Sequence, residues 1–138
     1  MNGRKNYRKR QRYPASAIEI AIRRRAKLSF LAKYTQVEAI DFNRNGVGIW
    51  SDTALSLGQA LELKIGLANQ GNQRLRGVVY NCKRIEHRYR VGIQFDTTFS
   101  KLMLEDVEAV NLLESIETEL SHIAALTENA NTDIEATN

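Results

Sequence analysis

The sequence is poor in the residues that build disulfides, metal centres and membrane spans. It has one cysteine, Cys82, and two histidines, His87 and His122, in 138 residues. A single cysteine cannot pair within the chain, and this set cannot assemble the usual cluster of soft metal ligands. No apolar run approaches the roughly 18 residues that a membrane-spanning helix needs. We therefore expect no disulfide, no metal site and no membrane span, with Cys82 half-buried in a strand.

The common catalytic motifs are also absent. There is no Gly-x-Ser-x-Gly, no His-Glu-x-x-His and no phosphate loop ending in Gly-Lys-Ser/Thr. These absences predict a non-enzymatic protein without a cofactor. The basic N-terminus is followed by Ile18, Glu19, Ile20 and Ile22 instead of an unbroken apolar stretch. It is therefore unlike a secretory signal, and the cytoplasm is the expected compartment.

The net charge is small, +4, but it hides an asymmetry along the chain. Residues 1–27 carry ten Lys or Arg and one Glu, whereas residues 101–138 carry one Lys and nine acidic groups. Residues 1–13 are basic without apolar periodicity, which predicts a flexible arm. Such an arm could bind nucleic acid, but the sequence shows no recognition helix or aromatic strand platform, and the acidic end would repel a polyanion. We expect no specific nucleic-acid binding.

In the middle of the chain, apolar and polar residues alternate, as they do in strands with one buried face. Asn45-Gly46 between apolar segments is a strong hairpin signal. The segment 23–34 fits a helical turn or a strand equally well. About six short strands separated by turns predict a mainly β domain over 14–99, a six-stranded antiparallel barrel. The apolar positions that carry this prediction are Ile18, Ile20, Ile22, Val37, Ala39, Val47, Ile49, Leu61, Leu63, Ile65, and the segments 75–85 and 90–95.

The pattern becomes helical after Phe99. Ser100 is a possible N-cap, and acidic residues follow it where the helix dipole favours them. An apolar stripe predicts an amphipathic helix over 100–126, followed by a disordered tail over 127–138. The stripe either packs on the barrel or pairs with a second subunit to form a homo-oligomer. Its members are Ala109, Leu113, Ile116, Leu120 and Ile123.

Two segments carry residues suited to an anionic guanine ligand. Arg8 and Arg12 lie four positions apart on the arm, and each guanidinium offers planar donors that fit phosphate oxygens or the O6/N7 edge of guanine. Asp41 can accept hydrogen bonds from guanine N1 and N2, and Gly46 allows a ligand close to the backbone. The alternative is an unspecific polybasic segment and an ordinary turn.

These segments, taken in order, resemble the PilZ domain family. The chain has Arg8-x-x-x-Arg12, then Asp41-x-Asn43-x-x-Gly46, then Val91-Gly92-Ile93-Gln94-Phe95. The family signature is Arg-x-x-x-Arg plus Asp/Asn-x-Ser-x-x-Gly on a six-stranded barrel. The resemblance covers roughly residues 8–100 and implies binding of the bacterial second messenger cyclic di-GMP, with ligand contacts from Arg8, Arg12, Asp41, Asn43 and Gly46.

Two departures from the family pattern leave alternatives open. Asn43 stands where the family has a hydroxyl residue. The arginine motif is also matched by Arg4-x-x-x-Arg8, and the arginine run 23–25 could contribute further basic groups from the barrel. The first hypothesis is a receptor in which cyclic di-GMP orders the arm and relays the signal to an unidentified downstream protein. The alternative is a degenerate barrel that does not bind the messenger and acts as a protein–protein interaction module.

Overall fold

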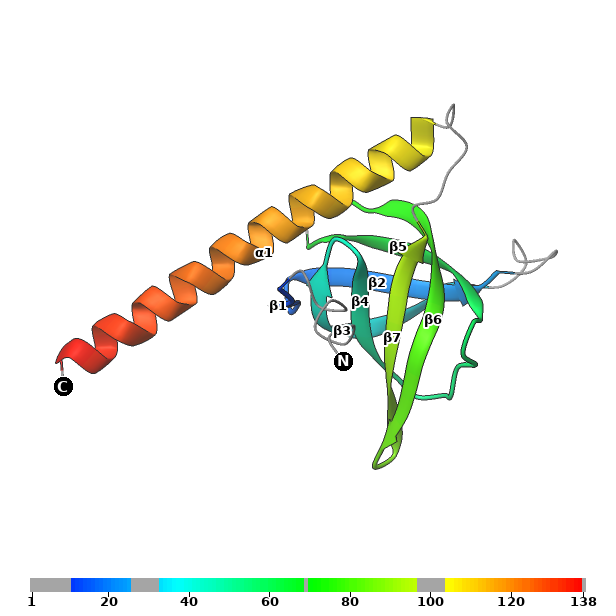
Figure 1. The fold of residues 1–138 in the computed structure, drawn as a ribbon, viewed down its shortest axis with the longest axis horizontal. Helices are drawn as coiled ribbons and strands as arrows, with labels where there is room; N and C mark the ends of the chain where they lie inside the picture. Colours follow the sequence, from blue (N-terminus) through cyan, green and yellow to red (C-terminus); the bar gives the residue numbers. More distant parts are fainter. Residues whose placement is uncertain (1–10, 26–32, 69, 97–103, 138) are drawn as a thin grey trace, which may run out of the picture.

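The computed structural model describes residues 11–25, 33–68, 70–96 and 104–137. Six long antiparallel strands are joined in the order β3-β2-β5-β6-β7-β4, and pairing of β3 with β4 closes the barrel (Figure 1). A two-residue strand, β1, pairs with the C-terminal part of β3, beyond the residues of β3 that pair with β2. The mainly β, six-stranded antiparallel barrel with a C-terminal helix is thus confirmed. The elements are β1 (Tyr13–Pro14), β2 (Ile18–Arg24), β3 (Thr35–Asn43), β4 (Gly46–Ser51), β5 (Ala60–Leu67), β6 (Gln73–Ile85), β7 (Arg88–Asp96) and α1 (Leu104–Thr137).

The barrel interior is filled by the alternating apolar residues of all six long strands. In β2 and β5 the paired residues Ile20 and Ile65 both point inward and are almost fully buried. The rings of Phe42 and Phe95 lie 5.6 Å apart between centroids in a tilted arrangement. Burial of one face of each strand follows directly from the period of two in the sequence. The other buried strand residues are Ile18, Ile22, Ala39, Val47, Ile49, Leu61, Leu63, Val79, Val91 and Ile93.

Two β-bulges interrupt this regular pairing, one in β3 and one in β6. In β3 the register shifts between Ala39, which pairs with Ile49, and Asp41, which pairs with Gly48. In β6 it shifts between Val79 and Asn81. A shift of one residue moves side chains to the opposite face of a sheet. The bulge in β3 therefore turns Asp41 to the outer face, while Phe42 still points into the core.

Helix α1 lies across one end of the barrel, and its C-terminal half projects beyond the barrel (Figure 1). It contacts β1, β3, β5 and β6. Leu113, Ile116 and Leu120 belong to the same hydrophobic core as the strands, and Ala109 is also buried. The predicted stripe therefore packs on the barrel, except for Ile123, which is 40% exposed. Pairing of α1 with a second subunit stays a prediction.

The ends of the elements differ from the prediction in two places. The helix continues to Thr137, whereas the sequence predicted a disordered tail from Thr127 onwards. This part of the chain has no Gly or Pro to end a helix, and Thr127 Oγ1 donates a hydrogen bond to the carbonyl of Ile123, one turn earlier. The boundary predicted at residue 13 falls inside β1.

Several predictions concern residues that the structure does not describe. Most of the basic arm (1–10), most of the ambiguous segment (26–32) and the N-cap candidate Ser100 lie outside the described residues. Cys82 is half-buried in β6, as predicted. Within the described ranges, no helix is both long and apolar enough to cross a membrane.

Candidate functional site

Asp41 and Arg12 meet because β1 pairs with β3. Pro14 is the register partner of Asp41, and Tyr13 is the partner of Phe42. This short ladder brings the residue just before β1 beside the carboxylate. Arg12 Nε and Nη2 donate to Asp41 Oδ1 at 3.0 and 2.8 Å. The two residues that the sequence placed in separate motifs therefore form one charge-assisted contact.

A second arginine reaches the same carboxylate from β7. Arg90 Nη2 donates to Asp41 Oδ2 at 3.2 Å. We call Asp41, Arg12 and Arg90 the Asp41 cluster. Two guanidinium groups face one carboxylate, so the cluster carries an excess positive charge. The side chain of Arg90 is 47% exposed, and both arginines have further N–H donors that these contacts do not use. The cluster is thus suited to an anion at the barrel surface.

Gly48 forms the floor beneath Asp41. A Cβ atom at position 48 would fall 2.6 Å from Asp41 Oδ1, so a side chain there would displace the carboxylate. Gly48 is also the register partner of Gly92 on β7. Two neighbouring strands therefore lack a side chain on the outer face here, where the Asp41 carboxylate covers Gly48 and the Tyr80 ring covers Gly92.

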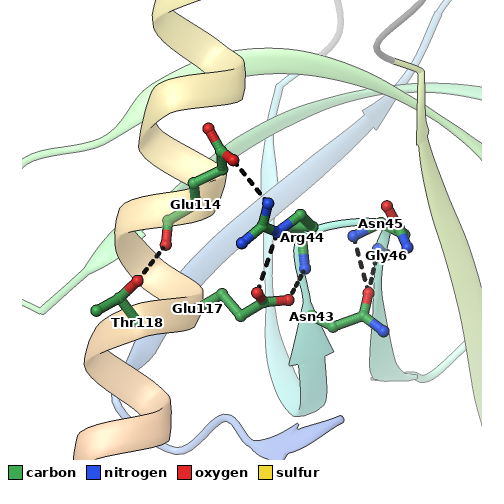
Figure 2. A network of polar contacts seen from close by, with 7 residues as sticks. All are labelled: Asn43, Arg44, Asn45, Gly46, Glu114, Glu117 and Thr118. Atoms are coloured by element: carbon green, nitrogen blue, oxygen red, sulfur yellow. Dashed lines mark hydrogen bonds and ion pairs between the residues drawn. The ribbon is translucent and has the colours of Figure 1, made fainter. Parts of the chain in front are cut away.

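Asn43 and Gly46 build the turn between β3 and β4. Asn43 Oδ1 accepts hydrogen bonds from the backbone N–H groups of Asn45 and Gly46 at 2.8 and 3.1 Å (Figure 2). The Asn43 side chain is buried, and a Cβ at position 46 would lie 2.5 Å from the carbonyl oxygen of Ile93. Both residues therefore fix the shape of the hairpin and the close approach of β7. The amide of Asn43 does not crowd the surface next to Asp41.

Arg44, at the tip of the same hairpin, is held by the helix. Its backbone N–H donates to Glu117 Oε2 at 2.8 Å, and its Nε donates to Glu117 Oε1 at 3.0 Å. Its Nη1 donates to Glu114 Oε2 at 2.6 Å (Figure 2). We call Arg44, Glu114 and Glu117 the Arg44 cluster. Glu117 is only 7% exposed, so a buried carboxylate of α1 anchors the partly exposed Arg44 of the hairpin.

A cavity of about 340 Å³ separates the start of the described chain from α1. Its lining includes Arg12, Tyr13 and Pro14 on one side and Leu120, Ile123 and Ala124 on the other. Arg12 therefore touches both the Asp41 cluster and this cavity. Beside the cavity, β1 also contacts the helix.

The structure brings together some of the predicted site residues and separates others. Arg12 and Asp41 are in contact, whereas Arg8 lies outside the described residues. Arg23, from the run 23–25, instead donates a hydrogen bond to Glu62 at 2.7 Å. It lies near the end of β2, which pairs with the start of β3. Among the residues that the structure describes, no group of His, Cys, Asp or Glu could hold a metal.

Sequence reasoning missed Arg90 and the Arg44 cluster. Arg90 immediately precedes the segment 91–95, and its outward position follows from the alternation of that strand. That alternation does not show that β7 lies close enough to β3 for Arg90 to reach Asp41. Arg44 and Glu117 are 73 residues apart, and no local pattern links them.

Comparison with known proteins agrees with this architecture. A family model described as PilZ domain matches residues 3–110. A K. pneumonia MrkH–c-di-GMP complex matches with a TM-score of 0.66 and 22% identity over 87% of this chain and 55% of that chain. The PilZ domain with c-di-GMP of YcgR from Escherichia coli matches with a TM-score of 0.61 and 13% identity over 88% of this chain and 97% of that chain.

A third solved structure is similar over the same barrel. Bacillus subtilis inhibitor of motility, MotI/DgrA, has a TM-score of 0.55 and 12% identity over 81% of this chain and 51% of that chain. The present chain spans about half the length of the MrkH chains that it matches. No curated protein sequence matched the chain.

Proposed function

Because the chain belongs to the PilZ domain family, we propose that it is a non-enzymatic receptor for cyclic di-GMP. The observation that carries the proposal is the contact between Arg12 and Asp41, which joins the two family motifs at one surface site. The ligand-binding residues in this proposal are Arg8, Arg12, Asp41, Asn43 and Gly46. A receptor for this bacterial messenger would act in the cytoplasm.

The charges of the Asp41 cluster suit the two parts of this ligand. Arg12 and Arg8 would bind phosphate oxygens or the O6/N7 edge of guanine, since a guanidinium can donate two parallel hydrogen bonds. Asp41 would accept from guanine N1 and N2. The position of Arg12 beside the carboxylate supports the Arg8-x-x-x-Arg12 register over Arg4-x-x-x-Arg8. Asn43 and Gly46 would act by holding the hairpin in shape.

The proposal includes a relay from the arm to a downstream protein. Contacts from Arg8 and Arg12 to the ligand would order the arm, since charge-assisted hydrogen bonds offset the entropy that the arm loses. Arg12 and Tyr13 line the cavity against α1, so an ordered arm would change the surface beside Leu120 and Ile123. The exposed acidic face of α1 is then the surface that a partner protein reads.

A titration with matched ligands tests the binding. We expect the full chain to bind cyclic di-GMP in isothermal titration calorimetry and to bind cyclic di-AMP, which keeps the phosphates but lacks the guanine edge, far more weakly. Arg8→Ala and Asp41→Ala should both lose binding while keeping the circular dichroism spectrum of the wild type. Ordering of residues 4–12 on ligand addition should be visible as reduced backbone mobility by NMR. Absence of heat from folded wild-type protein would contradict the proposal.

A further inference from the structure

The hairpin of β6 and β7 extends beyond the rest of the barrel. Pairing of β5 with β6 ends at Val78, and pairing of β4 with β7 ends at Tyr89, whereas β6 and β7 stay paired as far as Ile85 and Arg88. Figure 1 shows the joined ends of these two strands projecting past the other strands, on the side of the barrel away from α1. We call residues 83–88 the hairpin tip. The tip can therefore touch a surface that the body of the barrel does not reach.

The hairpin tip is basic. It contains Lys83, Arg84 and Arg88 and one acidic residue, Glu86. Lys83 and Arg84 are exposed, and within the described ranges none of the three cations forms an ion pair. Lys83 also lies directly opposite Arg90, and like charges in such positions lower the stability of a β-ribbon. No ion pair of the described barrel accounts for this concentration of positive charge.

An aliphatic side chain lies among these cations. Ile85 is the last residue of β6 and is 36% exposed. It belongs neither to the barrel core nor to the partly buried residues that pack against the core. Its register partner Arg88 instead lies over Trp50, with the guanidinium carbon 3.9 Å from the ring centroid. Ile85 therefore offers an apolar contact at the projecting end of a basic hairpin.

The acidic part of the chain lies away from the hairpin tip. Residues 101–138 carry nine acidic groups and one Lys, and α1 packs across the other side of the barrel (Figure 1). An extended anionic surface would attract the tip and repel the helix. The two charges therefore favour a single orientation, in which the tip faces the surface and the helix points away from it.

We propose that the hairpin tip docks on the surface of a bilayer that contains anionic lipids. Lys83, Arg84 and Arg88 would bind lipid phosphates, and Ile85 would enter the boundary between headgroups and acyl chains. The aliphatic residue favours this partner over nucleic acid, because a phosphate backbone offers it no apolar contact. Three cations and one aliphatic side chain give weak, reversible attachment. This function goes beyond messenger binding, since the tip contains no residue of the Asp41 cluster.

Co-sedimentation of the full chain with lipid vesicles tests the proposal. At low ionic strength we expect the protein to bind vesicles of phosphatidylcholine mixed with phosphatidylglycerol, and to leave vesicles of pure phosphatidylcholine unbound. Added salt should release the protein, because screening weakens the attraction between the tip and the anionic surface. Equal binding to the two kinds of vesicle, or no binding to either, would overturn the proposal.

Variants of the tip separate its charge from its apolar contact. Lys83→Ala combined with Arg84→Ala should weaken vesicle binding by about 25-fold, since each basic residue near an anionic surface contributes about fivefold. Ile85→Ser keeps every charge and should weaken binding by about tenfold. Glu86→Gln removes the acidic group and should strengthen binding by about fivefold. Arg74→Ala is the matched control, since Arg74 is exposed near the other end of β6, and it should bind within about twofold of wild type.

The same variants exclude a loss of folding and a different partner. Each should keep the circular dichroism spectrum and the cyclic di-GMP titration of the wild type, because none changes the Asp41 cluster. Wild-type vesicle binding in the double variant or in Ile85→Ser would overturn the bilayer contact. A protein that binds a DNA duplex through Lys83 and Arg84, without vesicle binding and without need of Ile85, would overturn it in favour of nucleic acid.

Discussion

Asp41 and Arg44 lie three residues apart on one hairpin, yet the clusters that they form have opposite net charge and different neighbours. In the first, two arginines surround one carboxylate on the outer face of the barrel, and Arg90 is 47% exposed. In the second, two glutamates of α1 surround Arg44, and the Glu117 side chain is only 9% exposed. The Asp41 cluster thus lies on the barrel surface with Arg90 as its most exposed member, whereas the Arg44 cluster joins the hairpin to α1 through the nearly buried Glu117.

This difference gives the two clusters different roles in the proposed receptor. The ion pair between Asp41 and the half-exposed Arg90 is worth little to stability and exchanges its partners at low cost. A buried pair resists the loss of either partner, because the remaining group is left without its hydrogen bonds. In the proposed receptor, Arg90 would therefore be available to a ligand phosphate, whereas the Glu117 contacts hold Arg44 and the hairpin against the helix. Three comparisons of variants test this division.

The largest effect should come from Arg12→Ala in ligand binding. We expect a loss of about a hundredfold in cyclic di-GMP affinity, since a hydrogen bond to a charged group contributes about 1.5–3 kcal/mol. Arg44→Ala removes an arginine from the same hairpin and should leave affinity within about threefold of wild type. Calorimetric titration of the two variants side by side measures both. Equal losses would show that the clusters do not divide the roles in this way.

A smaller effect should appear in the free energy of unfolding. Arg44→Ala leaves Glu117 without its guanidinium partner and should lower stability by about 1–2 kcal/mol. Arg90→Ala, on the exposed side of the Asp41 cluster, should change stability by less than about 1 kcal/mol. Urea denaturation followed by circular dichroism gives both values. A larger loss in Arg90→Ala than in Arg44→Ala would reverse the comparison.

The smallest effect should come from Asn43→Ser, which restores the residue of the family pattern. Asn43 Oδ1 serves the turn, and a serine oxygen can accept the same kind of backbone hydrogen bond. Cyclic di-GMP affinity should therefore change by less than about threefold. A protein that binds only after this substitution would instead be the degenerate barrel considered from the sequence.

The strands were predictable because each carries its own signal. The alternation of Leu61, Leu63 and Ile65 predicts a strand wherever it is placed, and all three side chains are buried in β5. The Asn45-Gly46 hairpin is equally local. The end of α1 was predicted less well. The apolar stripe is buried only as far as Leu120, whereas the backbone stays helical to Thr137. A hydrophobic pattern shows which residues of a helix pack against the core, and a helix can continue beyond its packed part.

The sequence by itself determined the barrel strands, the amphipathic helix and the residue types of the proposed site. Alternation, turn residues and charge are properties of short segments, so they can be read along the chain. Only the tertiary structure decided which of those residues meet. The bulge in β3 turns Asp41 outward, β1 brings Arg12 to it, and closure of the barrel brings Arg90 from β7. These contacts depend on strand register and ring closure, which no single segment encodes.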